Sequence, residues 1–186
     1  MLEFPDKKYS IIYADPPWQF DDRMGKKGVE SKYPTLSMDE LKELPVEKIA
    51  NDDCVLFLWC VFPMLQEGLD LIKAWGFTYK TIGFNWVKRN QTSGYFMGMG
   101  NWTRSNSEIC LIGIRGKPKR IDAGISQIID TPLAKHSKKP DIVRKRIIKL
   151  CGDLPRIELF ARTRIHGWDV WGNDEQLKQN PLEAFA

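Results

Sequence analysis

The sequence lacks the features that would place it in a membrane or outside the cell. None of its apolar runs reaches the ~18 residues that a membrane-spanning helix needs. Its first residues, MLEFPDKKYS, contain no apolar stretch of the kind that signal peptides carry. We therefore expect a cytoplasmic protein with no membrane partner.

Metal ligands are equally scarce. The chain has 4 cysteines and 2 histidines, and no two cysteines are spaced as in a CxxC pair. Cys60 and Cys110 lie in apolar runs, where cysteine behaves as a small hydrophobic residue. No GxGxxG follows a predicted strand, which argues against a dinucleotide-binding module. The sequence predicts reduced structural thiols and no metal site.

What is present is an ordinary globular composition with an uneven charge. The 186 residues, of which 42% are hydrophobic and 28% charged, predict a single domain over residues 1–186. Residues 80–166 hold 18 Lys and Arg against 6 Asp and Glu, whereas residues 1–79 hold 9 against 14. A stretch this basic is typical of a protein that binds a polyanion such as nucleic acid, but a solvated basic face would look the same. Charge alone leaves both interpretations open.

Apolar runs alternate with helical patterns along the chain. We expect strands at Ser10–Asp15, Cys54–Cys60, Phe77–Val87, Glu108–Ile114, Gln127–Ile129 and Arg156–Phe160. We expect helices from Ser37, with a capping box to Glu40, over Pro63–Trp75, stopped by Gly76, and over Pro140–Leu150. Flexible loops are expected at residues 19–35 and 90–106, and a polar tail from Asp174. This alternation predicts an α/β doubly wound sheet, which binds ligands at the carboxyl ends of its strands.

The sharpest local feature is Asp15-Pro16-Pro17-Trp18, at the end of the first predicted strand. Two prolines have no N–H, so the segment offers hydrogen-bond acceptors and almost no donors. Asp15 adds a carboxylate, and Trp18 adds a flat aromatic face. Together they suit a ligand that carries an NH2 group on an aromatic ring. A Pro-Pro turn beside a partly buried tryptophan is the plain structural alternative.

Such a segment has a chemical use with adenine. The exocyclic amine of adenine is a poor nucleophile, because its lone pair is conjugated into the ring. Two strong acceptors favour rehybridisation of that nitrogen, so that the lone pair can point at an electrophile. This is stabilisation of a transition state by preorganised groups.

Asp-Pro-Pro-Trp after a strand resembles the signature of methyltransferases that act on amino groups, and the whole chain resembles the MT-A70 family of N6-adenine methyltransferases. The resemblance continues through VLFLW (55–59), NWVKRNQ (85–91), KKPD (138–141), IELFAR (157–162) and the Gly167-Trp168 to Gly172-Asn173 segment. It implies a Rossmann-like methyltransferase sheet with a permuted motif order, in which the cofactor-binding half follows the catalytic motif. It also implies that the methyl donor is S-adenosylmethionine.

The resemblance implies roles for individual residues. Asp15, Pro16, Pro17 and Trp18 would hold the target adenine, and Asp15 would also lie near the amino-acid end of the cofactor. The remaining cofactor-binding positions would be Lys139, Phe160, Arg162 and Asn173. The chain departs from eukaryotic members after Arg162, where Arg164 and Ile165 replace a His-Asn pair.

Two segments are candidates for nucleic-acid binding. The loop of residues 90–106 carries Trp102 and Arg104, a combination that suits stacking on bases and pairing with phosphates. The cluster Arg115, Lys117, Lys119 and Arg120 would contact phosphates.

We expect a DNA adenine-N6 methyltransferase that needs no metal. Two alternatives stay open. One is an RNA adenosine methyltransferase, and the other is a non-catalytic subunit that binds nucleic acid. The sequence leaves undecided the recognition site and whether the chain works alone, as a homodimer or with a partner subunit.

Overall fold

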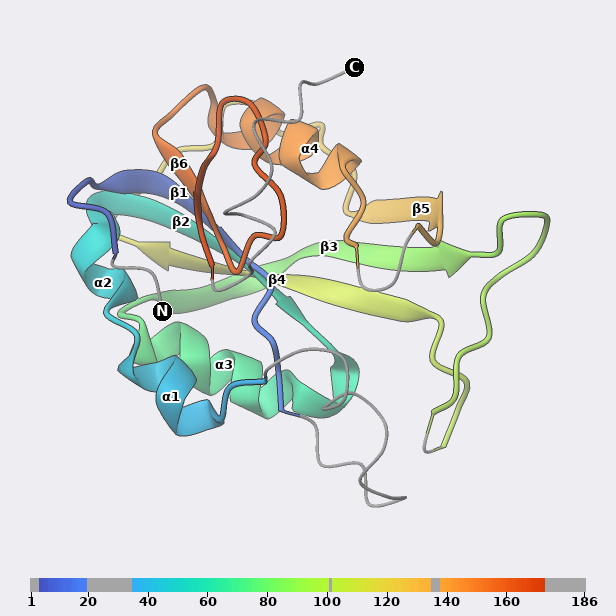
Figure 1. Ribbon diagram of the computed structural model, residues 1–186. Helices are drawn as coiled ribbons and strands as arrows, with labels where there is room; N and C mark the ends of the chain where they lie inside the picture. The colour runs from blue at the N-terminus through green and yellow to red at the C-terminus, as the bar shows by residue number, and fades with distance from the viewer. Residues whose placement is uncertain (1–3, 20–34, 101, 135–137, 173–186) are drawn as a thin grey trace.

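A computed structural model describes residues 4–19, 35–100, 102–134 and 138–172. Within them the chain forms one seven-stranded sheet in the order β5-β3-β4-β2-β1-β6-β7 (Figure 1). The strands are β1 (Tyr9–Ala14), β2 (Ala50–Cys60), β3 (Thr78–Arg89), β4 (Ser107–Arg115), β5 (Ile128–Pro132), β6 (Arg156–Leu159) and β7 (Asp169–Trp171). The helices are α1 (Met38–Glu43), α2 (Val46–Ile49), α3 (Leu65–Ala74), which follows the 3-10 turn η1 (Phe62–Met64), and α4 (Ile142–Cys151).

The strands run parallel except β4. It pairs antiparallel with β2 on one side and with β3 on the other, while β1 pairs parallel with both β2 and β6. The carboxyl ends of β1, β2, β3, β5, β6 and β7 therefore meet at one edge of the sheet, here called the carboxyl edge. The chain enters β4 at that edge and leaves it at the opposite amino edge.

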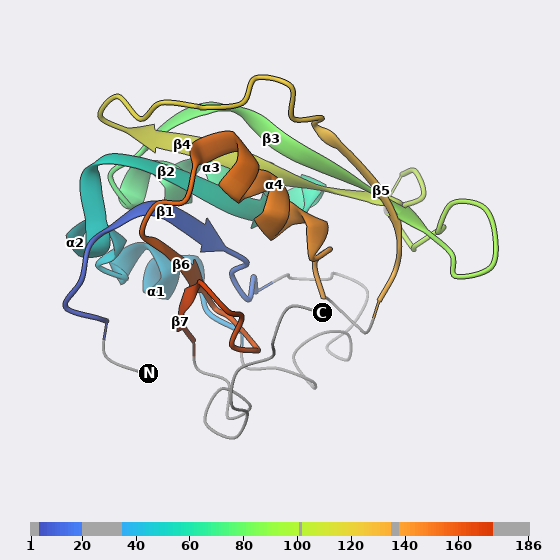
Figure 2. The same cartoon turned by 90° about the horizontal axis from the view of Figure 1, so that it is seen from above.

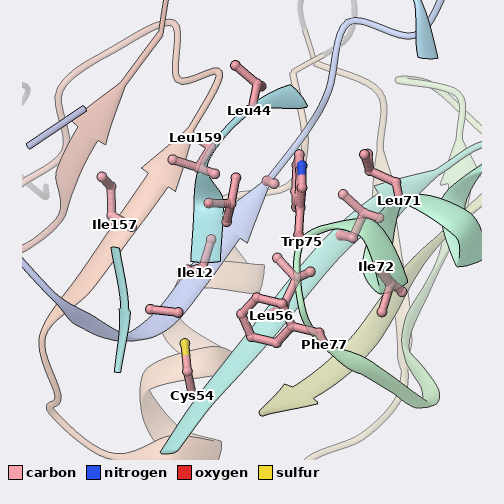
Figure 3. Packing of buried hydrophobic residues seen from close by; sticks show 14 of the residues in the cluster. Ile12, Leu44, Cys54, Leu56, Leu71, Ile72, Trp75, Phe77, Ile157 and Leu159 are labelled. Carbon is pink, nitrogen blue, oxygen red and sulfur yellow. The ribbon is translucent and has the colours of Figure 1, made fainter. Parts of the chain in front are cut away.

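Helices cover both faces of the sheet, which confirms the α/β class predicted from the sequence. In Figures 1 and 2, α4 lies on one face, and α1 and α3 lie on the other. Alternate residues of one strand belong to two different hydrophobic cores, because successive side chains of a strand point to opposite faces of the sheet. Ile12 and Leu56 pack with Ile72 and Trp75 of the α3 side (Figure 3), whereas Tyr13 packs with the α4 side.

The predicted helix boundaries are largely confirmed. Ser37 caps α1 through a capping box with Glu40, whose carboxylate accepts from the Ser37 N–H at 2.8 Å. The helix predicted over Pro63–Trp75 divides into η1 and α3, and Gly76 ends it with a φ of 81°. Two short elements, α2 and β7, were not expected.

The loop expected at residues 90–106 forms a hydrogen-bonded arm over its described residues, 90–100 and 102–106. Phe96 N–H donates to the Lys88 carbonyl at 2.9 Å, and Gly98 and Ser105 exchange two backbone hydrogen bonds. The arm therefore continues the β3–β4 pair beyond the carboxyl edge (Figures 1 and 2). Most of the loop expected at residues 19–35, and the tail expected from Asp174, lie outside the described residues.

The four cysteines are free and buried, as the sequence predicted. Burial raises the pKa of the Cys54 and Cys60 thiols to about 12 and that of Cys151 to about 11. Burial, followed by the charge of Asp15, raises the pKa of Cys110 well above its usual range. Among the described residues there is no cluster of metal-ligating side chains and no helix that could span a membrane.

Candidate active site at the carboxyl edge

The Asp-Pro-Pro-Trp segment starts where β1 reaches the carboxyl edge. β1 lies between β2 and β6 in the sheet, so the segment emerges between the carboxyl ends of these two strands. Trp18 N–H donates to the Pro16 carbonyl at 2.9 Å, and Leu36 N–H donates to the Pro17 carbonyl at 3.1 Å. A carbonyl oxygen has two lone pairs, so each proline can still accept a hydrogen bond from a ligand.

The indole of Trp18 is fixed by β2. Its Nε1–H donates to the Trp59 carbonyl at 3.2 Å, and its ring packs against the core on the α1–α3 side while staying partly exposed. A hydrogen bond at the ring edge sets the plane of the indole. Trp18 can therefore present an aromatic face to a ligand without first being ordered.

Asp15 is held by a lysine from a distant part of the chain. Lys139 Nζ lies 2.9 Å from the Asp15 carboxylate and 3.3 Å from Oε2 of Glu108. Lys88 Nζ, in turn, lies 2.5 Å from Oε1 of Glu108. We call these four residues the ion-pair chain: two carboxylates and two ammonium groups that alternate along the carboxyl edge.

The ion-pair chain is largely shielded from solvent, with side-chain exposure between 11% for Lys139 and 23% for Asp15. Burial lowers the pKa of Lys139, but the carboxylates of Asp15 and Glu108 outweigh it, so the pKa of the ammonium is raised. Burial likewise raises the pKa of Glu108, but Lys139 and Lys88 outweigh it, so that pKa is lowered. Lys139 and Glu108 therefore stay charged around neutral pH.

Aromatic rings line the same edge. Lys139 Nζ lies 5.5 Å from the Trp59 ring centroid, a cation–π distance. Trp59 meets Trp86 edge to face at 6.3 Å, and Trp59 Nε1–H donates to the Tyr13 hydroxyl at 2.6 Å. The ion-pair chain thus rests on rigid, well-packed rings, which limits the positions that Lys139 can take.

Sequence reasoning missed Glu108 and Lys88. Both fall within or beside motifs that were noticed, NWVKRNQ and the run EICLIGI, but neither motif indicates which side chains meet. Their contact depends on the antiparallel register of β3 and β4, in which Trp86 lies opposite Glu108. A carboxylate at the start of a buried strand is the signal that could have pointed to Glu108.

Two of the predicted cofactor residues, Phe160 and Arg162, lie just after β6. Phe160 follows β6 with a φ of 61°, in the left-handed region that a bulky residue rarely adopts. Its ring meets Trp171 edge to face at 5.5 Å, and Ala161 N–H donates to the Trp171 carbonyl at 3.2 Å. Arg162 follows, partly exposed. Asn173, the fifth predicted cofactor residue, lies outside the described residues.

The two predicted nucleic-acid segments lie at opposite edges. Trp102 and Arg104 are on the arm beyond the carboxyl edge, where Trp102 is 100% exposed. Arg115, at the end of β4, donates to the Glu47 carbonyl at the amino edge. The loop that follows carries Lys117, Lys119 and Arg120, and the Lys117 N–H donates to the Asp53 carboxylate at 2.7 Å.

The separation between these segments is large. Seven residue steps along β4 divide Glu108 from Arg115, which is roughly 23 Å at about 3.3 Å per residue. The arm therefore lies beyond the same edge of the sheet as the Asp-Pro-Pro-Trp segment, whereas the loop after β4 lies at the opposite edge.

Comparison with known proteins gives the family of the chain. The MT-A70 family model matches residues 9–174. The chain is 36% identical to the type II methyltransferase M.MunI of a Mycoplasma species, over 91% of this chain and 79% of that protein. It is 32% identical to an N(6)-adenosine-methyltransferase MT-A70-like protein of Drosophila melanogaster and 30% identical to the human N(6)-adenosine-methyltransferase catalytic subunit METTL3.

The coverage of these relatives differs. The two animal matches each cover 83% of this chain, but the chain spans only about a quarter of their length, 24% and 26%. The family match covers nearly the whole chain and includes every motif on which the resemblance was based. The chain therefore belongs to the MT-A70 family of methyltransferases, as its motifs predicted.

Proposed function

We propose that this chain transfers a methyl group from S-adenosylmethionine to the N6 atom of adenine in DNA. The observation that carries the proposal is the Asp15 carboxylate, fixed by Lys139 at 2.9 Å within an acceptor-rich Asp-Pro-Pro-Trp segment at the carboxyl edge. Membership of the MT-A70 family supports it. An acceptor held in place before the substrate arrives needs little reorganisation during the reaction.

The residues of the segment divide the work. The Asp15 carboxylate and a prolyl carbonyl accept the two N–H bonds of the adenine amine, and Trp18 stacks on the purine. The nitrogen lone pair then points along the line of transfer. As the N–C bond forms, the methyl C–S bond of the donor would break and leave a neutral thioether. The methylated amine would then lose one proton to solvent, with the Asp15 carboxylate helping to pass it on. Positioning and electrostatics supply the acceleration, without a covalent enzyme intermediate.

The methyl donor is a proposal that the residues fit. S-adenosylmethionine supplies an electrophilic methyl group on a sulfonium. Phe160 is held in a rare backbone conformation at the end of β6, next to β1, and such strain concentrates at ligand sites. We propose that Phe160 and Arg162 line the adenosine of the donor, that Asn173 contacts its ribose or adenine, and that Lys139 and Asp15 lie near its amino-acid end.

DNA is the proposed substrate because of M.MunI, a type II methyltransferase that this chain matches over most of both lengths. A target adenine in a duplex must leave the base stack, at a cost of a few kcal/mol. The arm supports this step, since Trp102 can stack on bases and Arg104 can pair with a phosphate beside the site. We propose that Arg115, Lys117, Lys119 and Arg120 contact phosphates farther along the duplex.

RNA is the second candidate substrate. It is favoured by the similarity to N(6)-adenosine-methyltransferases, one of which is named as a catalytic subunit, so a second chain or a second copy is included in the test. A non-catalytic binding subunit is the third reading. The intact Asp-Pro-Pro-Trp segment and its buried ion-pair chain count against it. We place the protein in the cytoplasm.

The test is methyl transfer from labelled S-adenosylmethionine to matched double-stranded DNA, single-stranded DNA and RNA, followed by digestion to nucleosides. We expect N6-methyldeoxyadenosine, and its loss in Asp15→Ala. Label in RNA alone would move the assignment to the RNA enzyme. Gel filtration shows whether the protein is a monomer or a dimer during the test. Binding of the cofactor without transfer to any substrate would indicate that a partner chain is needed.

A further inference from the structure

A buried arginine outside the proposed site ties α4 to the sheet. The Arg144 side chain is only 8% exposed, and its Nε and Nη2 donate to the two carboxylate oxygens of Glu158 on β6, each at 2.7 Å. Its guanidinium lies 5.6 Å from the ring centroid of Tyr13 on β1. The planar fork of arginine matches a carboxylate in this two-bond geometry, so the position of the guanidinium is closely fixed.

The same guanidinium has a third contact. Nη1 of Arg144 donates to the Asp141 carboxylate at 2.8 Å. Asp141 precedes α4 at the N-cap position, but its side chain makes no capping hydrogen bond with the helix. Its other carboxylate oxygen lies 3.0 Å from the Lys138 ammonium. Both carboxylate oxygens of Asp141 therefore contact side chains in or beside the turn formed by residues 138–141, rather than capping the start of the helix. Lys139 lies in that turn.

Stability alone is a weak reason to keep this arrangement. Burying two ions carries a desolvation cost, and a well-packed apolar pair of similar volume often stabilises a protein as well or better. Burial raises the pKa of Glu158 even though Arg144 opposes it. An apolar pair could not, however, direct a third donor at Asp141. The contact between Arg144 and Asp141 therefore explains why an arginine pairs with Glu158 here, because that contact fixes the turn of residues 138–141.

A second path joins the same groups. Tyr13, below the Arg144 guanidinium, accepts a hydrogen bond from Trp59, and the Trp59 ring carries the Lys139 ammonium. Arg144 and Lys139 therefore rest on two aromatic rings that are bonded to each other. Movement of Arg144 would displace Lys139 from both directions, through the turn and through the rings.

We propose that Arg144 is a positioning residue that locks the turn of residues 138–141 and thereby keeps Lys139 on the Asp15 carboxylate. The inference rests on the proposed function, since it assigns Arg144 a part in the orientation of the acceptor that binds the adenine amine. Asp141 is the link between Arg144 and the turn, and Glu158 is the anchor on the sheet.

The first experiment needs no activity. Lysines of the unliganded protein are reductively methylated with formaldehyde and cyanoborohydride, and the labelling rate of each is measured by mass spectrometry. Asp141→Ala cuts the link but leaves the Arg144–Glu158 pair. We expect Lys139 to label at least about tenfold faster in this variant, while exposed Lys145 on α4 keeps its rate. Unchanged protection of Lys139 would overturn the proposal.

The second experiment measures catalysis. We expect Asp141→Ala to lower kcat by roughly 10- to 100-fold, since a small misplacement can cost that much rate. KM for the donor, near which Lys139 is proposed to lie, should rise, while KM for DNA should stay within about threefold. Lys138→Ala, which removes only the exposed partner of Asp141, is the matched control and should keep kcat within about twofold. A merely structural role predicts instead that kcat follows the melting temperature in both variants.

A mutant cycle then separates positioning from general damage. Asp141→Ala should add little to the loss caused by Lys139→Met, because both act on one contact. Fully additive losses would contradict the proposal. If Asp141→Ala does not fold, Arg144→Met with Glu158→Met preserves packing and carries the same three measurements. If the parent protein transfers no methyl group, the proposed function fails, but the labelling result still decides whether Arg144 positions Lys139.

Discussion

The two edges of the sheet carry charge in different ways. At the carboxyl edge, Asp15, Glu108, Lys88 and Lys139 alternate in sign and are largely buried, and the arm extends an exposed tryptophan beyond them. At the amino edge, the loop after β4 is more basic in sequence. There the Arg115 side chain donates to the Glu47 backbone carbonyl, and the Lys117 backbone N–H donates to the Asp53 carboxylate. The basic loop after β4 therefore does not lie at the edge that carries the Asp-Pro-Pro-Trp segment. The direction of β4 decides which residues lie at that edge.

The largest expected difference between the edges comes from their aspartates. Asp15→Asn should lower kcat by roughly 10³-fold, because one preorganised group at a reacting centre is worth about that much. Asp53→Asn is the matched control at the amino edge and should leave kcat within about twofold. Single-turnover transfer to DNA measures both, and similar losses would remove the distinction between the edges.

Glu108→Gln tests the interior of the ion-pair chain. Without the negative charge of Glu108, nothing offsets the repulsion between the Lys139 and Lys88 ammonium groups. The Lys139 ammonium should then shift from its present position on the Asp15 carboxylate. We expect kcat to fall roughly 10- to 100-fold. The melting temperature should fall as well, because two largely buried ammonium groups lose the carboxylate that they share. A kcat equal to that of the parent would show that, within the ion-pair chain, only Asp15 and Lys139 matter for catalysis.

Trp102→Ala tests whether the arm contacts nucleic acid. Its removal should weaken DNA binding about tenfold, since stacking of an aromatic ring on a base contributes roughly 1–3 kcal/mol. Ile121→Ala is the control, because Ile121 is also an exposed hydrophobic residue but follows the loop after β4. Equal DNA binding by both variants would contradict a contact between the arm and DNA.

The pH dependence of stability distinguishes the buried chain from surface charge. The pKa of Glu108 is lowered in the fold from its ordinary 4.5, so its contribution is present above that value and is lost as pH falls through the folded pKa. The pKa of Lys139 is raised, so its contribution is present at neutral pH and is lost only as pH rises through its folded pKa. Urea unfolding should show the acid loss in the parent and a smaller one in Glu108→Gln.

The smallest effect is expected from the loop after β4. Lys119→Ala and Arg120→Ala should each weaken DNA binding about twofold and make its salt dependence slightly shallower, with no preference among sequences. Fluorescence anisotropy at several salt concentrations measures this. A loss as large as that of Trp102→Ala would bring the amino edge into the main interface.

The sequence predicted what depends on local pattern. The apolar runs indicated six of the seven strands, Ser37 and Glu40 indicated the start of α1, and Gly76 indicated the end of α3. It could not predict what depends on pairing, because no residue type specifies that β4 runs antiparallel and brings Glu108 to Lys139. For the same reason it could not show that Arg115, predicted to contact phosphates, lies at the opposite edge from the Asp-Pro-Pro-Trp segment, and the phosphate contact stays a prediction.

The roles of Phe160, Arg162 and Asn173 remain predictions from the family resemblance. The φ of Phe160 adds a physical reason for one of them that no sequence pattern contains. β7 was missed because three residues are too few to show an alternating pattern, and the strand exists only through its pairing with β6.

The burial of the four thiols bears on chemoselectivity. An enzyme that handles an electrophilic methyl group exposes its own nucleophiles to alkylation, and a thiolate is far more reactive than an aromatic amine. Burial raises the pKa of Cys60 to about 12, so its thiol stays protonated at pH 7. Cys60 and Cys110 lie on strands that lead to the carboxyl edge, and burial keeps both thiols protonated, so neither would compete with a substrate amine for such a methyl group.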